Sequence, residues 1–341
     1  STDLLVLLRV DPKGNLGVEG MGAWPTLLGL RRQGADYVPW AAHAGFGMPS
    51  VMRTVHLNED EQPLTTQVFV AGQDMSPPPP GQPNDQECST LNYWSYIEIL
   101  GSSFATMSTH CLPGLLNTYA PPSEILVQDF NGNGYKDVMI LVPEFGNVAF
   151  FPAEPPDDMS KIKYPKDPAL YYALGSDPVG LVGAEMNGDN DLDLVFANHT
   201  GVHIAAGLGG GDFAPPAAIP YSSGTITSFL LNDLNADGIL DIVGISRENS
   251  ELIVQLSQGL YGVYSPPKRM STGPKPGNPT GHQGTYINKG LFATDSDLLD
   301  GCADISVLLP ESLMVQRYVH LDGDCNVPKA PPNEGVEVGS D

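Results

Sequence analysis

Nine residues, Asp233-Leu-Asn-Ala-Asp-Gly-Ile-Leu-Asp241, show the pattern on which the rest of this chain is built. The first, third, fifth and ninth positions carry oxygen-bearing side chains, and the sixth is a glycine that permits a sharp turn. A hard cation that is wrapped by one short loop needs this arrangement, and calcium is the expected ion. The predicted ligands are the side chains of Asp233, Asn235, Asp237 and Asp241 and the backbone carbonyl of Ile239.

The same loop occurs twice more upstream, at intervals of 56 and 48 residues. The two copies read Asp129-Phe-Asn-Gly-Asn-Gly-Tyr-Lys-Asp137 and Glu185-Met-Asn-Gly-Asp-Asn-Asp-Leu-Asp193. All three loops lead into an apolar run, at 138–142, 194–197 and 242–245, which predicts a buried strand. By position, the further predicted ligands are Asp129, Asn131, Asn133, the Tyr135 carbonyl and Asp137, and then Glu185, Asn187, Asp189, the Asp191 carbonyl and Asp193. The second copy departs from the pattern twice, with Glu185 in first place and Asn190 where the others have glycine.

A looser fourth copy spans 295–304 and has one residue more than the others. Its candidate ligands are Asp295, Asp297, Asp300 and Asp304, and the apolar run 305–309 follows it. Degenerate copies at 3–8 and 56–70 are not expected to bind metal well. We expect two to four calcium ions with a mainly structural role, because a loop closed by its own carboxylates leaves few open coordination positions.

One repeat contains four short strands. In the copy that begins near Pro178, turn signals separate candidate strands at 179–184, 194–197, 202–206 and 217–221. The composition agrees, because 38 glycines and 32 prolines favour short strands joined by turns. A period of about fifty residues with four antiparallel strands is typical of a β-propeller blade. The predicted fold class is therefore an all-β propeller with four-stranded antiparallel blades.

The loop and its following strand are accompanied by a Gly-Asp-Phe element at 209–213 and a Gly-Leu-Tyr-Gly element at 259–262. Together they resemble the FG-GAP repeats, also called VCBS-type repeats, of integrin α-subunit propellers and of many secreted bacterial and fungal proteins. The resemblance is clear over 123–265 and 290–310 and faint before 120. It implies that calcium lies in the loop between the first and second strands of a blade, and that the protein recognises an extracellular ligand.

Seven blades are predicted, from second-strand-like runs near residues 4, 67, 95, 138, 194, 242 and 305. Six is the alternative, because the region 71–120 is irregular. A single propeller domain is expected over 1–328, with irregular blades in 1–120 and clear repeats in 123–310. Residues 329–341 are rich in proline, glycine and acidic residues and are expected to form a flexible tail.

The four cysteines form two pairs along the sequence, each separated by 23 positions. We expect the disulfides Cys88–Cys111 and Cys302–Cys325, although four cysteines allow three pairings and the sequence does not select one. The other interpretation is four free, buried thiols in a cytosolic protein. Disulfides together with calcium loops fit an oxidising compartment. An extracellular, cell-surface or periplasmic location is therefore expected, for a mature chain whose export signal has been removed.

The formal net charge is −24, from 40 acidic and 16 basic residues. This argues against nucleic acids and anionic membranes as partners, because phosphate recognition depends on Lys and Arg. Membrane insertion is not expected, since no apolar run of 18 residues is present. No Gly-x-Ser-x-Gly motif supports a nucleophile, and His199 and His203, four residues apart, have no third metal ligand in register. No enzymatic activity is predicted.

The predicted function is that of a binding or adhesion module for an extracellular glycan or protein. Tyrosines near the strand ends could stack on sugar rings, anchor a protein interface or fill the core between blades; they are Tyr171, Tyr172, Tyr221, Tyr261 and Tyr264. The alternatives are a structural subunit of a larger surface assembly and a propeller polysaccharide lyase. One N-glycosylation sequon, Asn198-His-Thr200, is present, and a chance occurrence explains it equally well.

Overall fold

The structure is a computed structural model of the chain. It describes residues 3–7, 27–33, 36–43, 48–55, 66–73, 92–100, 103–112, 121–155, 162–219, 226–246, 249–272, 291–294, 303–309, 314–318 and 336–337. Every regular element in these residues is a β-strand except the 3-10 helix η1 (Pro143–Phe145). They include no helix of the length and hydropathy that a membrane span requires. The chain divides into two compact units, Ser1–Asp129 with Asn133–Ala173, and Phe130–Gly132 with Leu174–Asp341.

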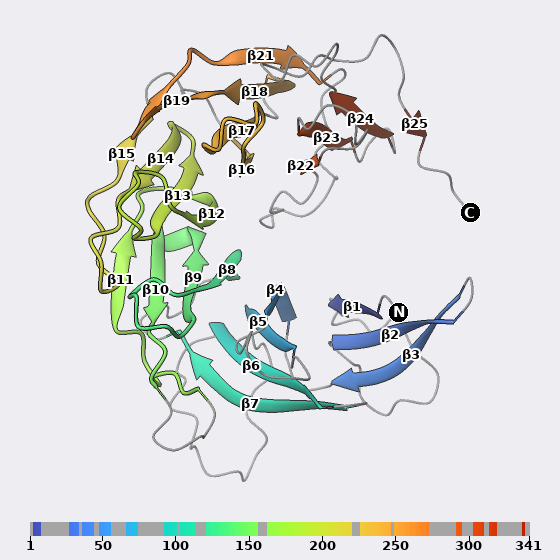
Figure 1. The fold of residues 1–341 in the computed structure, drawn as a ribbon. Helices are drawn as coiled ribbons and strands as arrows, with labels where there is room; N and C mark the ends of the chain where they lie inside the picture. Colours follow the sequence, from blue (N-terminus) through green and yellow to red (C-terminus); the bar gives the residue numbers. More distant parts are fainter. Residues whose placement is uncertain are drawn as a thin grey trace. The chain divides into compact units, whose positions relative to one another are not determined.

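The described part of the first unit contains three antiparallel sheets (Figure 1). Spatial order follows chain order in each sheet, as in a meander of hairpins. The first sheet consists of β1 (Asp3–Leu7), β2 (Leu27–Gln33) and β3 (Asp36–His43). The second consists of β4 (Met48–Val55), β5 (Gln67–Gln73), β6 (Asn92–Leu100) and β7 (Ser103–Cys111). The third consists of β8 (Glu124–Gln128), β9 (Asp137–Val142), β10 (Asn147–Phe151) and β11 (Leu170–Ala173).

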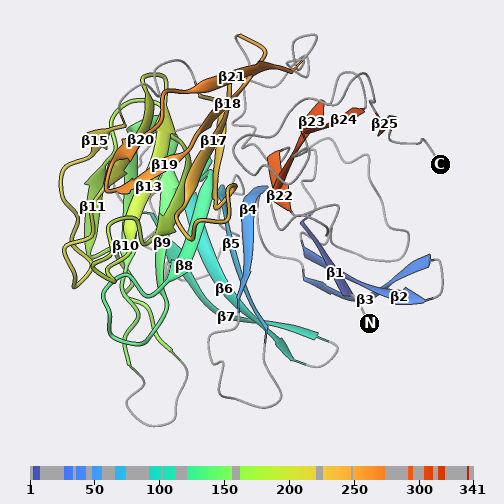
Figure 2. The same cartoon turned by 45° about the horizontal axis from the view of Figure 1, so that its top comes forward.

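The second unit contains three four-stranded antiparallel sheets in its described residues. They are β12 (Val179–Ala184), β13 (Asp193–Asn198), β14 (Gly201–Ala205) and β15 (Ala217–Ala218); β16 (Ser228–Asn232), β17 (Asp241–Ser246), β18 (Glu251–Gln255) and β21 (Lys268–Ser271); and β22 (Leu291–Thr294), β23 (Asp304–Leu309), β24 (Met314–Tyr318) and β25 (Val336–Glu337). An additional hairpin, β19 (Ser257–Leu260) and β20 (Val263–Tyr264), is inserted between β18 and β21 (Figure 2).

The second strand of each clear repeat is buried along its whole length. β9, β13 and β17 have no exposed residue, and their nearly continuous apolar sequences suit strands that are covered on both faces. In the middle sheet of the second unit, Val243 on β17 lies opposite Leu230 on one side and Val254 on the other. The apolar runs that follow the Asp-rich loops therefore form the centres of their sheets, as predicted.

Apolar side chains also pack between consecutive sheets within each unit. In the first unit, Phe69 of β5 and Phe151 of β10 belong to one buried cluster. In the second unit, Val195 of β13 and Ile242 of β17 share a cluster, and a further cluster packs β17 and β18 against β22–β24. Face-to-face packing of four-stranded antiparallel sheets is how propeller blades bury their apolar surface.

The strands predicted for the repeat near Pro178 are confirmed, with small differences at their ends. The predicted strands 179–184, 194–197 and 202–206 correspond to β12, β13 and β14, and β15 is shorter than the predicted 217–221. The four strands pair in chain order and antiparallel. The all-β class and the four-stranded antiparallel sheets were therefore predicted correctly.

The separation of residues 67 and 95 into two blades was wrong. These runs are β5 and β6, which pair directly with Phe69 opposite Tyr96 in one sheet. The 18 residues 74–91 between them look like a blade boundary in the sequence, but a hairpin with a long connection has the same appearance. The described residues form six sheets of three or four strands. The number of blades stays a prediction.

Several predictions fall outside the described residues. These are the cysteines Cys88, Cys302 and Cys325, and with them both disulfides, and the loop residues Asp295, Asp297 and Asp300. Part of the predicted tail is described, and there Val336 and Glu337 pair with Val315 and Met314. These two residues therefore belong to the last sheet. The polar composition of the segment predicted a flexible tail, but it carries no information about pairing with a distant strand. The domain boundary at 328 stays a prediction.

Candidate functional site

Each of the three regular Asp-rich loops connects the first strand of a sheet to the second. Residues 129–136 join β8 to β9, residues 185–192 join β12 to β13, and residues 233–240 join β16 to β17. In all three loops the fourth and sixth positions have a left-handed backbone, with φ values of 70° and 86° at Gly132 and Gly134, 85° and 70° at Gly188 and Asn190, and 59° and 83° at Ala236 and Gly238. Asparagine tolerates this conformation, so Asn190 leaves the shape of its loop unchanged.

The first carboxylate of each loop holds the turn together. The backbone N–H groups of Asn133 and Gly134 donate to Asp129 Oδ1 and Oδ2 at 3.1 and 2.8 Å. Asp233 accepts the same two bonds from its own loop, also at 3.1 and 2.8 Å. Glu185 accepts from the third, fourth and sixth positions of its loop. The longer side chain of Glu185 therefore serves the same purpose as the aspartate of the other copies.

The third and fifth positions turn their oxygens into the loop. Asn235 Oδ1 accepts from the N–H of Asp237 at 3.2 Å, and Asp237 Oδ1 accepts from the N–H of Ile239 at 2.9 Å. The amide of Asn235 donates to Asp237 Oδ2 at 2.9 Å. The loop at 185–193 contains the same three bonds. In both loops the side-chain oxygens of the third and fifth positions thus accept bonds from backbone N–H groups of the same loop.

The ninth-position aspartates lie deeper, because each begins a buried second strand. Asp193 accepts the N–H of Met186 at 2.9 Å and the N–H of Gly207 at 2.7 Å. Asp241 accepts the N–H of Leu234 at 2.9 Å and the N–H of Ser257 at 2.8 Å. In each case the second donor lies two residues beyond the third strand. The aspartate therefore ties the start of its loop to the connection after the third strand, a role that the sequence analysis did not predict.

Asp137 repeats this arrangement in the first unit. It is fully buried and its Oδ1 accepts the N–H of Ala153, two residues beyond β10, at 2.7 Å. The side-chain amide of Asn133 donates to the carbonyl of Ala153 at 3.1 Å. Tyr164 adds a bond from its hydroxyl to the carbonyl of Lys136 at 2.9 Å. In all three sheets the N–H donor lies two residues beyond the third strand. This constant spacing is a signal in the sequence that could have indicated the role of the ninth-position aspartate.

Negative charges accumulate in the loops. Burial, with the negative charges of Asp237 and Asp233, raises the pKa of Asp241 to about 6, although the hydrogen bonds from Ser257 and Leu234 lower it. Burial also raises the pKa of Asp193, and the charges of Asp189 and Glu185 act in the same direction. A bound cation would offset this repulsion between carboxylates.

The donor chemistry of the loops fits a hard cation, because every predicted ligand is a carboxylate, amide or backbone oxygen. The described part of the chain contains no group of three or more His, Cys, Asp or Glu side chains placed together to hold a metal ion. Hydrogen bonds within each loop bring the predicted ligands into one turn. Calcium ligation by these residues stays a prediction.

In the fourth loop the structure describes one of the predicted ligands, Asp304. It begins β23, as Asp137, Asp193 and Asp241 begin their second strands. It is buried, and its Oδ2 pairs with Arg317 Nη2 of the neighbouring strand β24 at 2.7 Å. The guanidinium therefore supplies a positive charge beside this carboxylate, so Asp304 is placed for a structural ion pair.

His203 and Asn198 stabilise the turn between β13 and β14. The His203 ring stacks on Phe196, with centroids 5.2 Å apart, and its Nε2 lies 3.1 Å from Asn198 Oδ1. Asn198 Oδ1 also accepts from the N–H and the hydroxyl of Thr200. Asn198 is buried, so the side chain of the sequon has a structural role in the turn. The interpretation of His199 and His203 as hairpin residues agrees with this arrangement.

Comparison with known proteins supports the repeat. Residues 186–244 match the FG-GAP-like repeat family. A lectin from Agrocybe aegerita that recognises non-reducing terminal N-acetylglucosamine is similar in structure, with a TM-score of 0.52, 17% identity, and coverage of 91% of this chain and 74% of the lectin chain. A periplasmic gluconolactonase from Pseudomonas aeruginosa gives a TM-score of 0.58 and 13% identity, with coverage of 99% and 83%. No curated protein matches the sequence. The chain therefore contains a match to the FG-GAP-like repeat at residues 186–244 and shares the fold of β-propeller proteins.

Proposed function

We propose that this chain is a calcium-stabilised β-propeller that acts as an extracellular binding module for a glycan or a protein. The observation that carries the proposal is the repetition of one loop. Three loops between the first and second strands of three sheets carry oxygen-bearing side chains at the same positions, and their fourth and sixth residues share a left-handed backbone. A turn that needed no ion would not require this set of oxygens at every copy, since many polar residues form turns.

The ions would have a mainly structural role. Each would be held by the oxygens of one loop. It would reduce the repulsion between carboxylates, which adds to the effect of burial in raising the pKa of Asp193 and Asp241. Two to four ions per chain are proposed, with the fourth site depending on Asp295, Asp297 and Asp300. An oxidising location with the disulfides Cys88–Cys111 and Cys302–Cys325 belongs to the same proposal.

A recognition role is supported by the family resemblance and by the lectin that shares the fold. The likeness to the gluconolactonase concerns the fold, on which enzymes are also built. A structural subunit of a surface assembly and a propeller lyase are therefore the alternatives. A structural subunit would copurify with partner chains, and a lyase would turn over an acidic polysaccharide.

The test is a glycan-array screen of the purified chain in calcium and again in EGTA, with elemental analysis of the same sample. Calcium in the protein together with calcium-dependent binding to a defined sugar would support both parts of the proposal. A folded protein without bound metal would contradict the calcium part. Binding to no glycan and to no extracellular protein in a pull-down would contradict the recognition part.

A further inference from the structure

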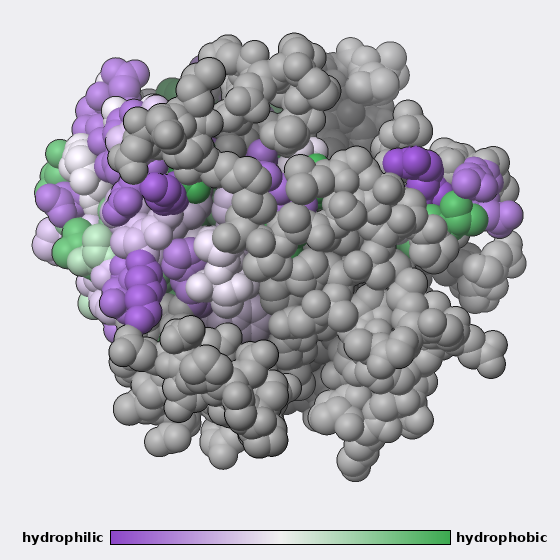
Figure 3. Space-filling view, turned by 90° about the horizontal axis from the view of Figure 1, so that it is seen from below, coloured by the Kyte–Doolittle hydropathy of each residue, from purple (hydrophilic) through white to green (hydrophobic). Residues whose placement is uncertain are grey.

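An exposed apolar surface lies on the connections of the second unit. Five of the eight large hydrophobic side chains that are exposed in the described part of the chain belong to it. We call this group the loop patch; it consists of Leu208, Ile239, Leu260, Tyr261 and Val263. Leu208 and Leu260 are the most exposed, at 64% and 69%. Figure 3 shows hydrophobic residues interspersed among hydrophilic ones on the described part of the face that it draws.

The hairpin β19–β20 presents three of these side chains. Tyr264, at its base, is buried in the cluster that joins β13 and β14 to β17 and β18. Ser265 closes the base, since its N–H donates to the carbonyl of Leu256 at 2.8 Å and its Oγ accepts the N–H of Leu256 at 3.0 Å. The tip, Leu260 and Tyr261, is therefore held outward on a fixed support, which reduces the entropy that a partner must remove on binding.

The hairpin lies beside two Asp-rich loops. A Cβ atom on Gly259 would be 3.6 Å from Ile239 Cδ1, so the hairpin touches the loop of its own sheet. Burial, with the negative charges of Asp193 and Asp189 in the loop of the preceding sheet, raises the pKa of Tyr261 to about 12. In both views β19 lies next to the sheet of β12–β15 (Figures 1 and 2).

Leu208 lies on the connection that follows β14. A Cβ atom on Gly209 would be 3.3 Å from Asp191 Oδ2, and one on Gly207 would be 2.5 Å from the Leu192 carbonyl. The connection that carries Leu208 is therefore packed closely against the loop at 185–193. The two loops and the connections that pack against them therefore form a region that carries both the apolar side chains and the carboxylates.

This region is strongly acidic. The two loops and the connections beside them contain eight acidic residues and no Lys or Arg, and two divalent ions would still leave them negative. The acidic residues are Glu185, Asp189, Asp191, Asp193, Asp212, Asp233, Asp237 and Asp241. A second copy of this chain, with a net charge of −24, is disfavoured as the occupant by repulsion.

The side chains of the loop patch favour a protein over a sugar. Four of the five are aliphatic, and sugar rings stack on flat aromatic faces. Apolar side chains surrounded by charged ones are typical of a protein interface, in which a Tyr or Leu anchor supplies affinity and the charges select the partner. We propose that the loop patch docks a basic segment of a protein partner, with an apolar side chain against Leu260 and Tyr261 and Arg or Lys side chains against the loop carboxylates. The inference rests on the proposed binding role and names its surface and partner class.

The experiment measures binding of a short synthetic peptide of arginine and leucine to the whole chain in calcium. A peptide of glutamate and leucine tests the contribution of charge, and a peptide of arginine and serine tests the contribution of apolar contact. The variant Leu260→Ser/Tyr261→Ser removes the tip without changing charge. Its matched control is Leu170→Ser/Tyr171→Ser, an exposed Leu–Tyr pair on β11 that also lies near a carboxylate, Asp167.

We expect the arginine–leucine peptide to bind best, the tip variant to weaken its binding at least about tenfold, and the control to change it less than about twofold. Equal melting temperatures of the variants would show that both are folded. Equal effects of the two variants, or no binding of this peptide by the native chain, would overturn the inference. Glycan binding that persists in the tip variant would leave the proposed function intact, whereas glycan binding lost with the tip would assign the patch to a sugar and also overturn the inference.

Discussion

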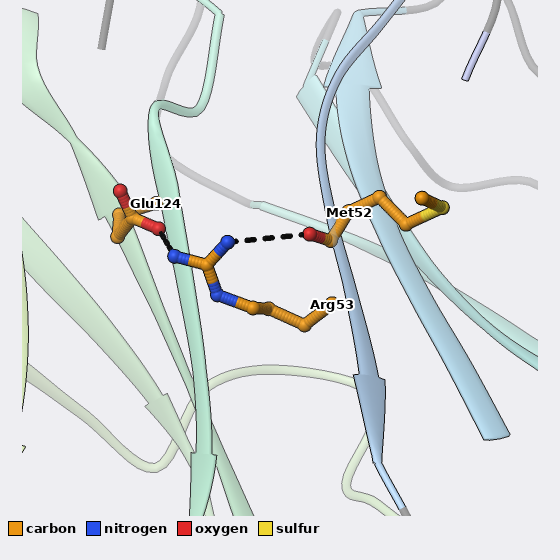
Figure 4. Close-up of polar contacts among 3 residues, drawn as sticks. All are labelled: Met52, Arg53 and Glu124. Carbon is orange, nitrogen blue, oxygen red and sulfur yellow. Dashed lines mark hydrogen bonds and ion pairs between the residues drawn. The ribbon is translucent and has the colours of Figure 1, made fainter. Parts of the chain in front are cut away.

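The guanidinium of Arg53 on β4 contacts the carboxylate of Glu124 on β8 and so joins two sheets of the first unit (Figure 4). The Glu124 side chain is buried, whereas that of Arg53 is 38% exposed. Arg53 also donates to the carbonyl of Met52 on its own strand at 3.4 Å. The pair therefore compensates a buried negative charge between the sheets.

Replacing Arg53 by Met should leave the carboxylate of Glu124 buried without its partner. Breaking a fully buried pair costs about 3 to 5 kcal/mol, and we expect about 2 kcal/mol here because Arg53 is partly exposed to water. Urea denaturation of the variant measures this loss. The double variant Arg53→Met/Glu124→Gln should recover most of it, and a double variant no more stable than the single one would contradict the interpretation.

The ninth-position and fifth-position aspartates should differ in their response to chelator. Asp193→Asn removes an acceptor for a buried N–H, so we expect a loss of about 2 kcal/mol that persists in EGTA. Asp189→Asn, in a more exposed position, should weaken the protein mainly in calcium, because its predicted role is ligation. Thermal melts in both buffers measure the difference. Identical profiles for the two variants would show that the aspartates share one role.

Removing calcium from the native chain should lower its melting temperature. A ligand that binds the folded state alone stabilises it by about 2.7 kcal/mol per site at a hundredfold excess over Kd. The measurement is a melt in calcium and in EGTA, followed by elemental analysis. An unchanged melt of a sample that contains no metal would show that the loops are turns without ions.

The stability of the first unit should depend on pH through His110. Its ring stacks on Trp94, with centroids 4.2 Å apart, and its Nε2 lies 2.9 Å from Ser108 Oγ. Burial lowers the pKa of His110 to about 4, although hydrogen bonds to the backbone of Pro165 and Lys166 raise it. The unfolded chain therefore binds a proton below about pH 6.5 that the folded chain excludes until about pH 4. The stability due to neutral His110 is present above this window and is lost as the pH falls through it.

His110→Phe keeps a ring on Trp94 and removes this titration. Relative to that variant, the native chain should lose on the order of 2 kcal/mol between pH 7 and about pH 4.5. Chemical denaturation at the two pH values measures the free energy of unfolding of each protein. Both proteins contain the same carboxylates, so the effect of carboxylate titration cancels in the comparison. Parallel pH profiles would show that another group is responsible.

The features of this chain that depend on neighbouring residues could be predicted from its sequence. The Asp-rich loops form through bonds that span five residues or fewer, such as those from Asn133 and Gly134 to Asp129, so their pattern could be read directly. The apolar runs after them predicted the buried second strands, and the period of about fifty predicted four-stranded sheets.

The features that depend on residues far apart in the chain became visible in the folded structure. The pairing of β5 with β6 and of β25 with β24 bridges long connections that leave no local signal. Asp193 was predicted as a ligand, but its bond to Gly207 depends on where the third strand ends. Tyr261 and Tyr264 are similar in sequence context, yet one is exposed and the other buried, because the hairpin inserts only its base between two sheets. Bonds across a loop are specified by its own residues, whereas burial is specified by the strands that pack around it.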